Sequence, residues 1–108
     1  MASNQENEIA AALDRLWTRF LPEIRARVEI LESAAQALAN GELATAQRQQ
    51  AAGAAHKLAG TLGTFGLARG TVVARKLERL YVGGVGPAAE VARQMAQEIR
   101  ELVDRRGA

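Results

Sequence analysis

The fold is decided by residues 9–38, which read IAAALDRLWTRFLPEIRARVEILESAAQAL. Apolar side chains recur along this stretch at spacings of three and four, which is the repeat of one face of an α-helix. The positions on this stripe are Ile9, Leu13, Leu16, Trp17, Phe20, Ile24, Val28, Leu31, Ala35 and Leu38. The pattern therefore predicts amphipathic helix across the stretch, with these residues facing a common core.

Pro22 interrupts this pattern. Proline has no amide hydrogen to donate, and it disfavours helical geometry at the residue before it. We therefore expect a short first helix that ends near Phe20 and a second helix with Pro22 in its first turn. The second helix should end at Asn40 and Gly41, since both residue types suit the left-handed conformation that closes many helices.

Three further helices are expected downstream. The first starts near Glu42 and ends in the glycine-rich segment 63–66, the second ends in segment 82–86, and Pro87 suits the first turn of the third. The expected inward positions are Leu43, Ala51, Ala55, Leu58 and Leu62 in the first of these helices, Val73, Leu77 and Leu80 in the second, and Val91, Met95, Ile99 and Leu102 in the third.

Short turns between amphipathic helices place neighbouring helices antiparallel. The predicted fold class is all-α: an antiparallel up-down four-helix bundle with an additional short N-terminal helix, in a single domain over residues 1–108. The composition agrees, because 48% of the residues are hydrophobic but only 4% are aromatic, and no segment shows the alternation of a strand. Residues 104–108 are expected to fray.

Several classes of chemistry are disfavoured by composition. The chain has no cysteine and one histidine, so disulfides, thiolate nucleophiles and multi-histidine metal sites are not expected. No strand followed by a glycine-rich loop is present to cradle ATP. We therefore expect no cofactor and no kinase activity of its own.

The charge pattern bears on partners and location. The net charge is +2, and the 14 lysines and arginines are scattered along the chain, which predicts at most a weakly basic face for an acidic protein and no nucleic-acid binding. No apolar run reaches the about 18 residues of a membrane span, and the first residues lack the pattern of a secretory leader. We expect no membrane association and a cytoplasmic location.

His56 is the only histidine, and helical geometry predicts where it points. At about 100° of rotation per residue, Leu58, Leu62 and the inward alanines lie about 100° to 160° from it, so the imidazole should face solvent. The residues on its own face are Gln49, Ala52, Gly53, Ala59, Gly60 and Gly63. Each helical glycine costs about 1 kcal/mol relative to alanine, which indicates that this face either receives another protein or packs closely against a helix.

The chemistry of an exposed imidazole is compatible with phosphoryl transfer. Its unperturbed pKa of about 6.5 leaves a nucleophilic lone pair near neutral pH. In-line transfer between two proteins requires such a nucleophile in an unobstructed surface. The alternative is that His56 is an ordinary solvated side chain, and the helical geometry alone does not decide between the two.

Residues 55–66, AHKLAGTLGTFG, resemble the signature of histidine-containing phosphotransfer (HPt) domains, His-x-Leu-(Lys)-Gly followed by small residues. Residues 74–78, ARKLE, look like part of that family's next helix. The resemblance implies a four-helix bundle in which His56 exchanges a phosphoryl group with the aspartate of a receiver domain. It also implies that Gly60 is the position kept small beside the histidine, and that any Mg²⁺ belongs to the partner's aspartate site.

One position departs from this resemblance. Members often have a lysine three residues after the histidine, and this chain has Ala59 there. Lys57 and Gln49 are the candidates for tuning the imidazole or the phosphate, although either could be an ordinary solvated side chain. Arg75, Lys76 and Arg79 could form a basic rim for an acidic receiver, but such charges often serve only solubility.

The predicted function is that of a phosphorelay protein that shuttles a phosphoryl group between His56 and a receiver aspartate. Its partners would be a response-regulator receiver domain, a hybrid histidine kinase or both, and a monomer is expected because the module must expose His56. An alternative is an adaptor of the same fold that docks on a receiver or a kinase without carrying phosphate. A further alternative is an unrelated structural bundle.

Overall fold

The computed structural model describes residues 3–83 and 87–107. Within these residues the chain forms four helices and no strands: α1 (Asn4–Ala39), α2 (Thr45–Thr64), α3 (Ala68–Val82) and α4 (Ala89–Arg106). The predicted all-α class is confirmed. Helix α3 ends at Val82, within the segment 82–86 where the turn was expected, and residues 84–86 of that segment lie outside the described residues. Pro87 is not in the first turn of the last helix, as predicted, because α4 begins at Ala89 with Ala88 as its N-cap.

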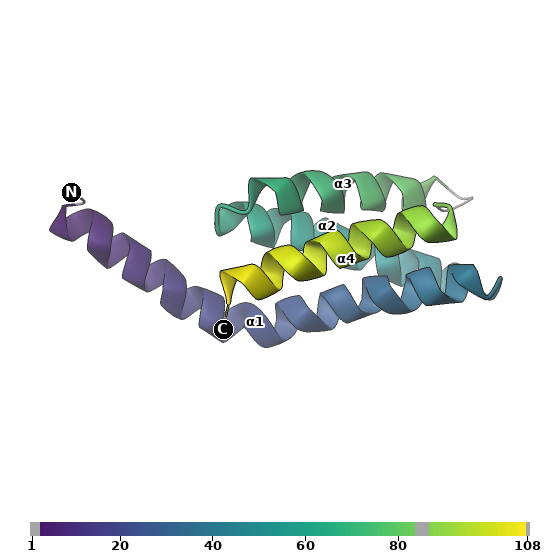
Figure 1. Cartoon of the computed structure of the whole chain (residues 1–108), viewed down its shortest axis with the longest axis horizontal. Helices are drawn as coiled ribbons and strands as arrows, with labels where there is room; N and C mark the ends of the chain where they lie inside the picture. The colour runs from purple at the N-terminus through teal and green to yellow at the C-terminus, as the bar shows by residue number, and fades with distance from the viewer. Residues whose placement is uncertain (1–2, 84–86, 108) are drawn as a thin grey trace.

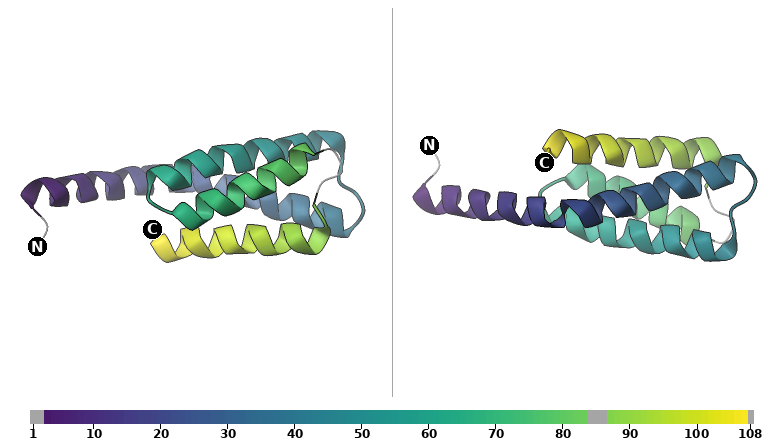
Figure 2. Two further views of the ribbon diagram at one scale, coloured as in Figure 1. Left: turned by 90° about the horizontal axis from the view of Figure 1, so that it is seen from above. Right: turned by 90° about the horizontal axis from the view of Figure 1, so that it is seen from below.

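The helices follow one another around the bundle. Each packs against the next in the chain, and α4 also packs against α1. Successive helices run in opposite directions along the bundle in Figure 1 and in both views of Figure 2. The molecule is 53 Å long and 20 Å wide, because α1 extends beyond the other three helices at its N-terminal end.

The predicted separate N-terminal helix is wrong, since α1 continues through Pro22 without a break. Pro22 lies on the exposed side of the helix and removes one backbone hydrogen bond, at a cost of about 3 kcal/mol. Leu21 and Ile24, beside it, are buried, and burial of such side chains contributes about 1.5–3 kcal/mol each. Packing therefore outweighs the proline, and α1 bends between its protruding and packed parts (Figure 1).

The helix ends are closed by specific backbone geometry. At the end of α1, Gly41 adopts a φ of 69°, and the amides of Gly41 and Glu42 donate to the carbonyls of Leu38 and Ala37 at 3.1 and 2.8 Å. This confirms the predicted left-handed cap. Gly66, with φ 77°, closes α2 in the same way. Helix α2 begins at Thr45 rather than at Glu42.

Several expected core positions differ from those observed. Leu80 and Val91 are 37% and 39% exposed, and Met95 and Leu102 are only partly buried. The side chains that α3 and α4 bury instead include Tyr81, Ala92, Ala96 and Val103. The sequence pattern favours the bulkiest apolar side chains, whereas α4 buries the small side chains of Ala92 and Ala96.

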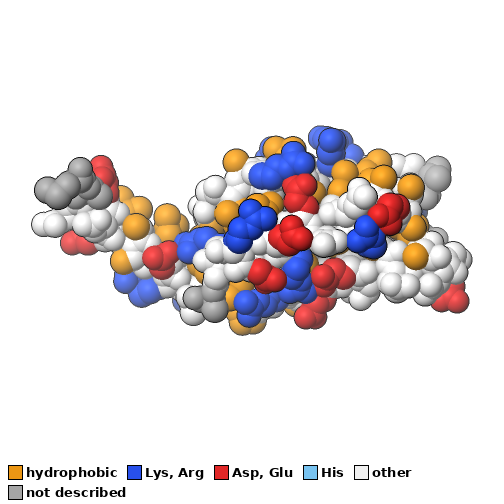
Figure 3. Space-filling model, viewed as in Figure 1, with side chains coloured by type: hydrophobic (Ala, Val, Ile, Leu, Met, Phe, Trp, Pro, Cys, Tyr) orange, Lys and Arg blue, Asp and Glu red, His pale blue; other side chains and the backbone are white. Residues whose placement is uncertain are grey.

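The apolar stripe of α1 is less buried towards its N-terminal end. Ile9, Leu16 and Phe20 were expected in the core but are exposed. The first turns of α1 extend beyond the other helices, whereas Leu16 and Phe20 lie at the edge of the bundle, where they line a surface concavity together with Thr61, Thr64 and Phe65. Apolar side chains are visible along it in Figure 3. Trp17 is buried, as predicted, and packs edge-on against Phe65, with ring centroids 5.2 Å apart.

The C-terminal end is held in place as far as Gly107, so the predicted fraying of the described tail residues is wrong. The indole nitrogen of Trp17 donates to the carbonyl of Gly107. The guanidinium of Arg106 lies over the Trp17 ring, 5.2 Å from its centroid, and donates to Asp14 at 2.8 Å. These contacts connect α4 to α1 at the point where α1 leaves the bundle.

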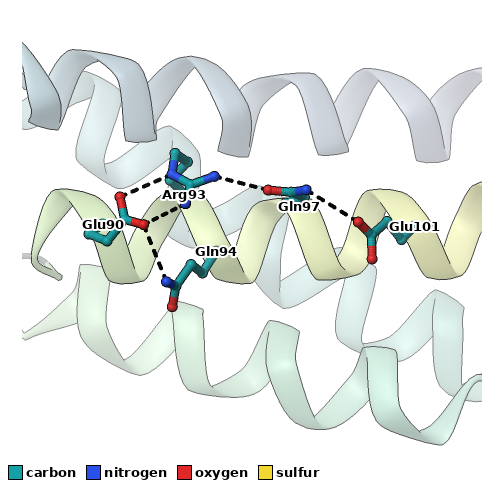
Figure 4. A network of polar contacts seen from close by, with 5 residues as sticks. All are labelled: Glu90, Arg93, Gln94, Gln97 and Glu101. Atoms are coloured by element: carbon teal, nitrogen blue, oxygen red, sulfur yellow. Dashed lines mark hydrogen bonds and ion pairs between the residues drawn. The ribbon is translucent and has the colours of Figure 1, made fainter.

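Charged side chains of both signs are interspersed on the face shown in Figure 3. Along the exposed side of α4, Glu90, Arg93, Gln94, Gln97 and Glu101 form a chain of contacts between successive turns (Figure 4). Contacts at this spacing support the helix itself. None of the helices in the described part of the chain combines the length and apolar character of a membrane span.

Candidate functional site

The His56 side chain projects from α2 into solvent, with 74% of its surface exposed. The neighbouring Ala55 and Leu58 are fully buried and fix the rotation of the helix. The predicted orientation of the imidazole is therefore confirmed. Since α2 packs most extensively against α3, residues of α3 are the ones that can reach this imidazole from another helix.

The nearest polar partner of the imidazole is Glu78 of α3. Nδ1 of His56 lies 2.8 Å from Oε2 of Glu78. An ionised carboxylate only accepts hydrogen bonds, so this contact assigns a proton to Nδ1 and leaves the lone pair of the neutral ring on Nε2. The carboxylate therefore orients the ring and selects its tautomer.

Glu78 was missed as a site residue by the sequence analysis. It belongs to the segment that resembles the family's next helix, but it is 22 residues away from His56. A helical wheel gives only local neighbours, and the contact depends on the register of α3 against α2. The available signal was that Glu78 follows Arg75 by three residues, so that the two side chains share a helix face.

A concavity of about 290 Å³ lies beside the imidazole. Its lining residues are His56, Ala59, Gly60, Arg75, Glu78 and Arg79, and we call it the His56 concavity. Ala59 was expected on the exposed docking face, but only 5% of its surface is exposed. Helix α3 covers it, and the Thr71 hydroxyl donates to its carbonyl at 2.8 Å, so Ala59 lies at the base of the concavity.

The glycines of α2 leave space that no helix fills. A Cβ atom added to Gly53 or Gly60 would meet nothing within 4 Å, so close helix packing does not explain these two glycines. A Cβ on Gly63 would lie 3.1 Å from the Thr71 hydroxyl, which makes that position tighter. All three glycines are exposed, and Ala52 is half-buried.

The glycine that does permit close packing is Gly70 of α3, which the sequence analysis did not single out. It is buried, and a Cβ there would lie 2.8 Å from Cδ1 of Leu62 in α2. Gly70 therefore sets how closely α3 approaches α2 and, with that, how closely Glu78 approaches His56. Its position two residues after the start of α3 gave no sign of this contact.

Gln49 and Lys57 are exposed, but neither lines the His56 concavity. Gln49 is two helical turns from His56, roughly 10 Å along the axis. The cationic side chains that do line the concavity, Arg75 and Arg79, come from α3. Part of the predicted basic rim thus lies beside the imidazole, while Lys76 is outside the concavity.

Within the described residues, no group of three or more histidine, cysteine, aspartate or glutamate side chains is arranged to hold a metal ion. The described site instead offers one nucleophilic nitrogen, one carboxylate against the opposite ring nitrogen, and two guanidinium groups. Such an arrangement is suited to accepting an electrophilic, negatively charged group from outside the protein.

Comparison with known proteins identifies related sequences. The family model described as "Hpt domain" matches residues 15–107. Protein RcaC of Microchaete diplosiphon is 39% identical over 82 residues, which cover 76% of this chain and 12% of RcaC. The chain thus corresponds to a small part of that relative's length. No solved structure matches it.

Proposed function

The chain belongs to the Hpt domain family, and we propose that it is a phosphocarrier that shuttles a phosphoryl group between His56 and the aspartate of a receiver domain. Membership in the family supports a role in histidine phosphotransfer within two-component signalling. In this proposal the chain acts as a cytoplasmic monomer. Its partners are receiver domains, either free or within hybrid histidine kinases.

The observation that carries the proposal is the environment of the imidazole. The ring is exposed, yet the hydrogen bond from Nδ1 to Glu78 orients it. Gly53 and Gly60 leave open space on the same helix, so a second protein can approach the outer ring nitrogen. A merely solvated histidine needs neither the oriented ring nor the open surface.

The transfer step follows from this geometry. The Nε2 lone pair attacks the phosphorus atom of the receiver's aspartyl phosphate and forms an N–P bond. The bond between phosphorus and the aspartate oxygen breaks, and the receiver's carboxylate leaves with the electron pair. The ring keeps its Nδ1 proton and becomes positively charged, and the Glu78 carboxylate at 2.8 Å stabilises that charge.

The same contact serves the reverse step. A phosphorylated ring that keeps its Nδ1 proton is a good leaving group, because departure of the phosphoryl group restores a neutral imidazole. Glu78 favours this protonated form without bonding to the phosphate itself. The proposal assigns any Mg²⁺ to the receiver's aspartate site and any ATP-dependent phosphorylation to a separate kinase.

The proposal is tested by mixing the purified chain with phosphorylated receiver domains and measuring acid-labile phosphate on the chain. We expect label on the wild type and none on His56→Gln, with the same receiver affinity for both. His56 is exposed, so this substitution should leave the thermal stability unchanged. Receiver binding without label on the wild type would contradict the proposal and favour the adaptor, for which the absence of a lysine at Ala59 is the supporting observation.

A further inference from the structure

Two arginines of α3 face the His56 concavity. Arg75 and Arg79 are one helical turn apart, and both line the concavity together with Glu78. The carboxylate of Glu78 already accepts the hydrogen bond from His56. The charged groups beside the imidazole therefore comprise two guanidiniums and one carboxylate that is engaged with the ring.

These two arginines differ from the arginines that pair across helices. Arg69 bonds to Glu98 at 2.7 Å and Arg100 bonds to Glu32 at 2.7 Å, and each pair joins two helices. Within the described residues, neither Arg75 nor Arg79 makes an ion pair with a carboxylate. Their guanidinium groups remain available to an incoming anion.

The charge balance of the concavity favours such an anion. Before transfer, its two positive charges exceed its one negative charge. A phosphoryl group adds about −1.5 to −2 near neutral pH. The buried Ala59 and the side-chain-free Gly60 leave room for it next to the ring. Lys57, the cation adjacent to the histidine in sequence, does not line this space.

We propose that Arg75 and Arg79 bind the phosphoryl group of phosphorylated His56, so that α3 supplies the cations that Ala59 of α2 cannot. This inference rests on the proposed function. Planar guanidiniums donate two hydrogen bonds each to phosphoryl oxygens, and their charges oppose the negative charge carried through the transfer. Glu78 holds the ring from one side, and the arginines hold the phosphoryl group.

The first test needs no receiver. Three proteins are compared: the wild type, the double variant Arg75→Gln/Arg79→Gln, and the control Lys57→Gln. Each is phosphorylated on His56 with phosphoramidate, and its phosphorus NMR resonance is followed as a function of pH. Guanidiniums favour the dianion, so we expect the double variant to raise the pKa of the phosphoryl group by about one unit. Lys57→Gln should leave it unchanged. Identical titrations for wild type and double variant would overturn the inference even if His56 is the phosphoacceptor.

The second test measures transfer from a phosphorylated receiver in a single turnover. We expect the double variant to be slower by at least about tenfold, because it loses the charged hydrogen bonds to the phosphoryl oxygens. Lys57→Gln should stay within about twofold of the wild type, and Arg75→Lys/Arg79→Lys should recover part of the rate. Affinity for the unphosphorylated receiver should not change. A parallel loss of that affinity would overturn the inference and assign the arginines to docking.

Discussion

The face of α4 and the surface around His56 use charged side chains in different ways. On α4, the hydrogen bonds from Arg93 and Arg69 lower the pKa values of Glu90 and Glu98, and the carboxylates stay paired within the protein. Around His56, Arg75 and Arg79 face an open concavity instead. The carboxylates of α4 are thus used in ion pairs within the protein, whereas the two arginines beside His56 keep their charge available for an external group.

The largest effect expected from breaking this contrast concerns Glu78. In Glu78→Gln the amide can still meet Nδ1 of His56, but it cannot stabilise a positively charged ring. Charged hydrogen bonds exceed neutral ones by roughly 1–1.5 kcal/mol, so the transfer rate should fall about tenfold. The measurement is single-turnover transfer from a phosphorylated receiver.

The matched control is Glu98→Gln on α4. It removes a carboxylate that pairs with Arg69 rather than one that contacts the imidazole, so transfer should proceed at the wild-type rate. Equal transfer rates for Glu78→Gln and wild type would show that the carboxylate has no part in the reaction.

A second prediction concerns the buried core and its response to alkaline pH. Burial raises the pKa of Tyr81 to about 12. The folded-state pKa lies above the unfolded value of about 10. The contribution of Tyr81 to the free energy of unfolding is therefore fully present below pH 10 and is lost as the pH rises through 12. The loss is on the order of 2–3 kcal/mol. Urea unfolding between pH 9 and about 12 measures it.

Tyr81→Phe should remove this tyrosine-dependent part of the alkaline loss. Its hydroxyl has no hydrogen-bond partner among the described residues, so the variant should be at least as stable as the wild type at neutral pH. The rate of phosphoryl transfer to His56 should be unchanged, since the Tyr81 side chain is buried and does not line the His56 concavity. A variant as alkali-sensitive as the wild type would contradict this explanation.

The smallest effects are expected at two glycines with opposite surroundings, one beside open space and one packed against another helix. Gly60→Ala meets open space and should stabilise α2 by up to about 1 kcal/mol. Gly70→Ala brings a Cβ to 2.8 Å from Leu62 and should destabilise the bundle by about 1 kcal/mol, since only a side-chain end must move. Thermal unfolding of both variants measures the difference, and stabilisation of both would contradict the assigned packing role of Gly70.

The sequence predicted the features that depend on one helix at a time. The exposure of His56 follows from the apolar positions of α2 itself, and the cap at Gly41 follows from residue type. The predicted exposure of Ala59 was wrong because this residue lies at the edge of the exposed face of α2, about 60° from His56. Only the position of α3 decides that such an edge residue is buried.

The features that depend on two helices were not predictable in the same way. Pro22 predicted a break, but burial of Leu21 and Ile24 on the inner side keeps α1 continuous. The contact between His56 and Glu78 requires the register of α2 against α3. That register depends partly on Gly70, whose role shows only when Leu62 is placed against it.

In the proposed mechanism, His56 carries the phosphoryl group on Nε2 while Nδ1 stays bonded to Glu78. The most direct test is heteronuclear NMR of the chain after phosphorylation by a receiver, with nitrogen-labelled histidine and detection of the coupling between phosphorus and the ring nitrogens. We expect a single phosphorylated site, His56, with phosphorus coupled to Nε2 and a proton retained on Nδ1. Phosphorus on Nδ1, or on a residue other than His56, would contradict it.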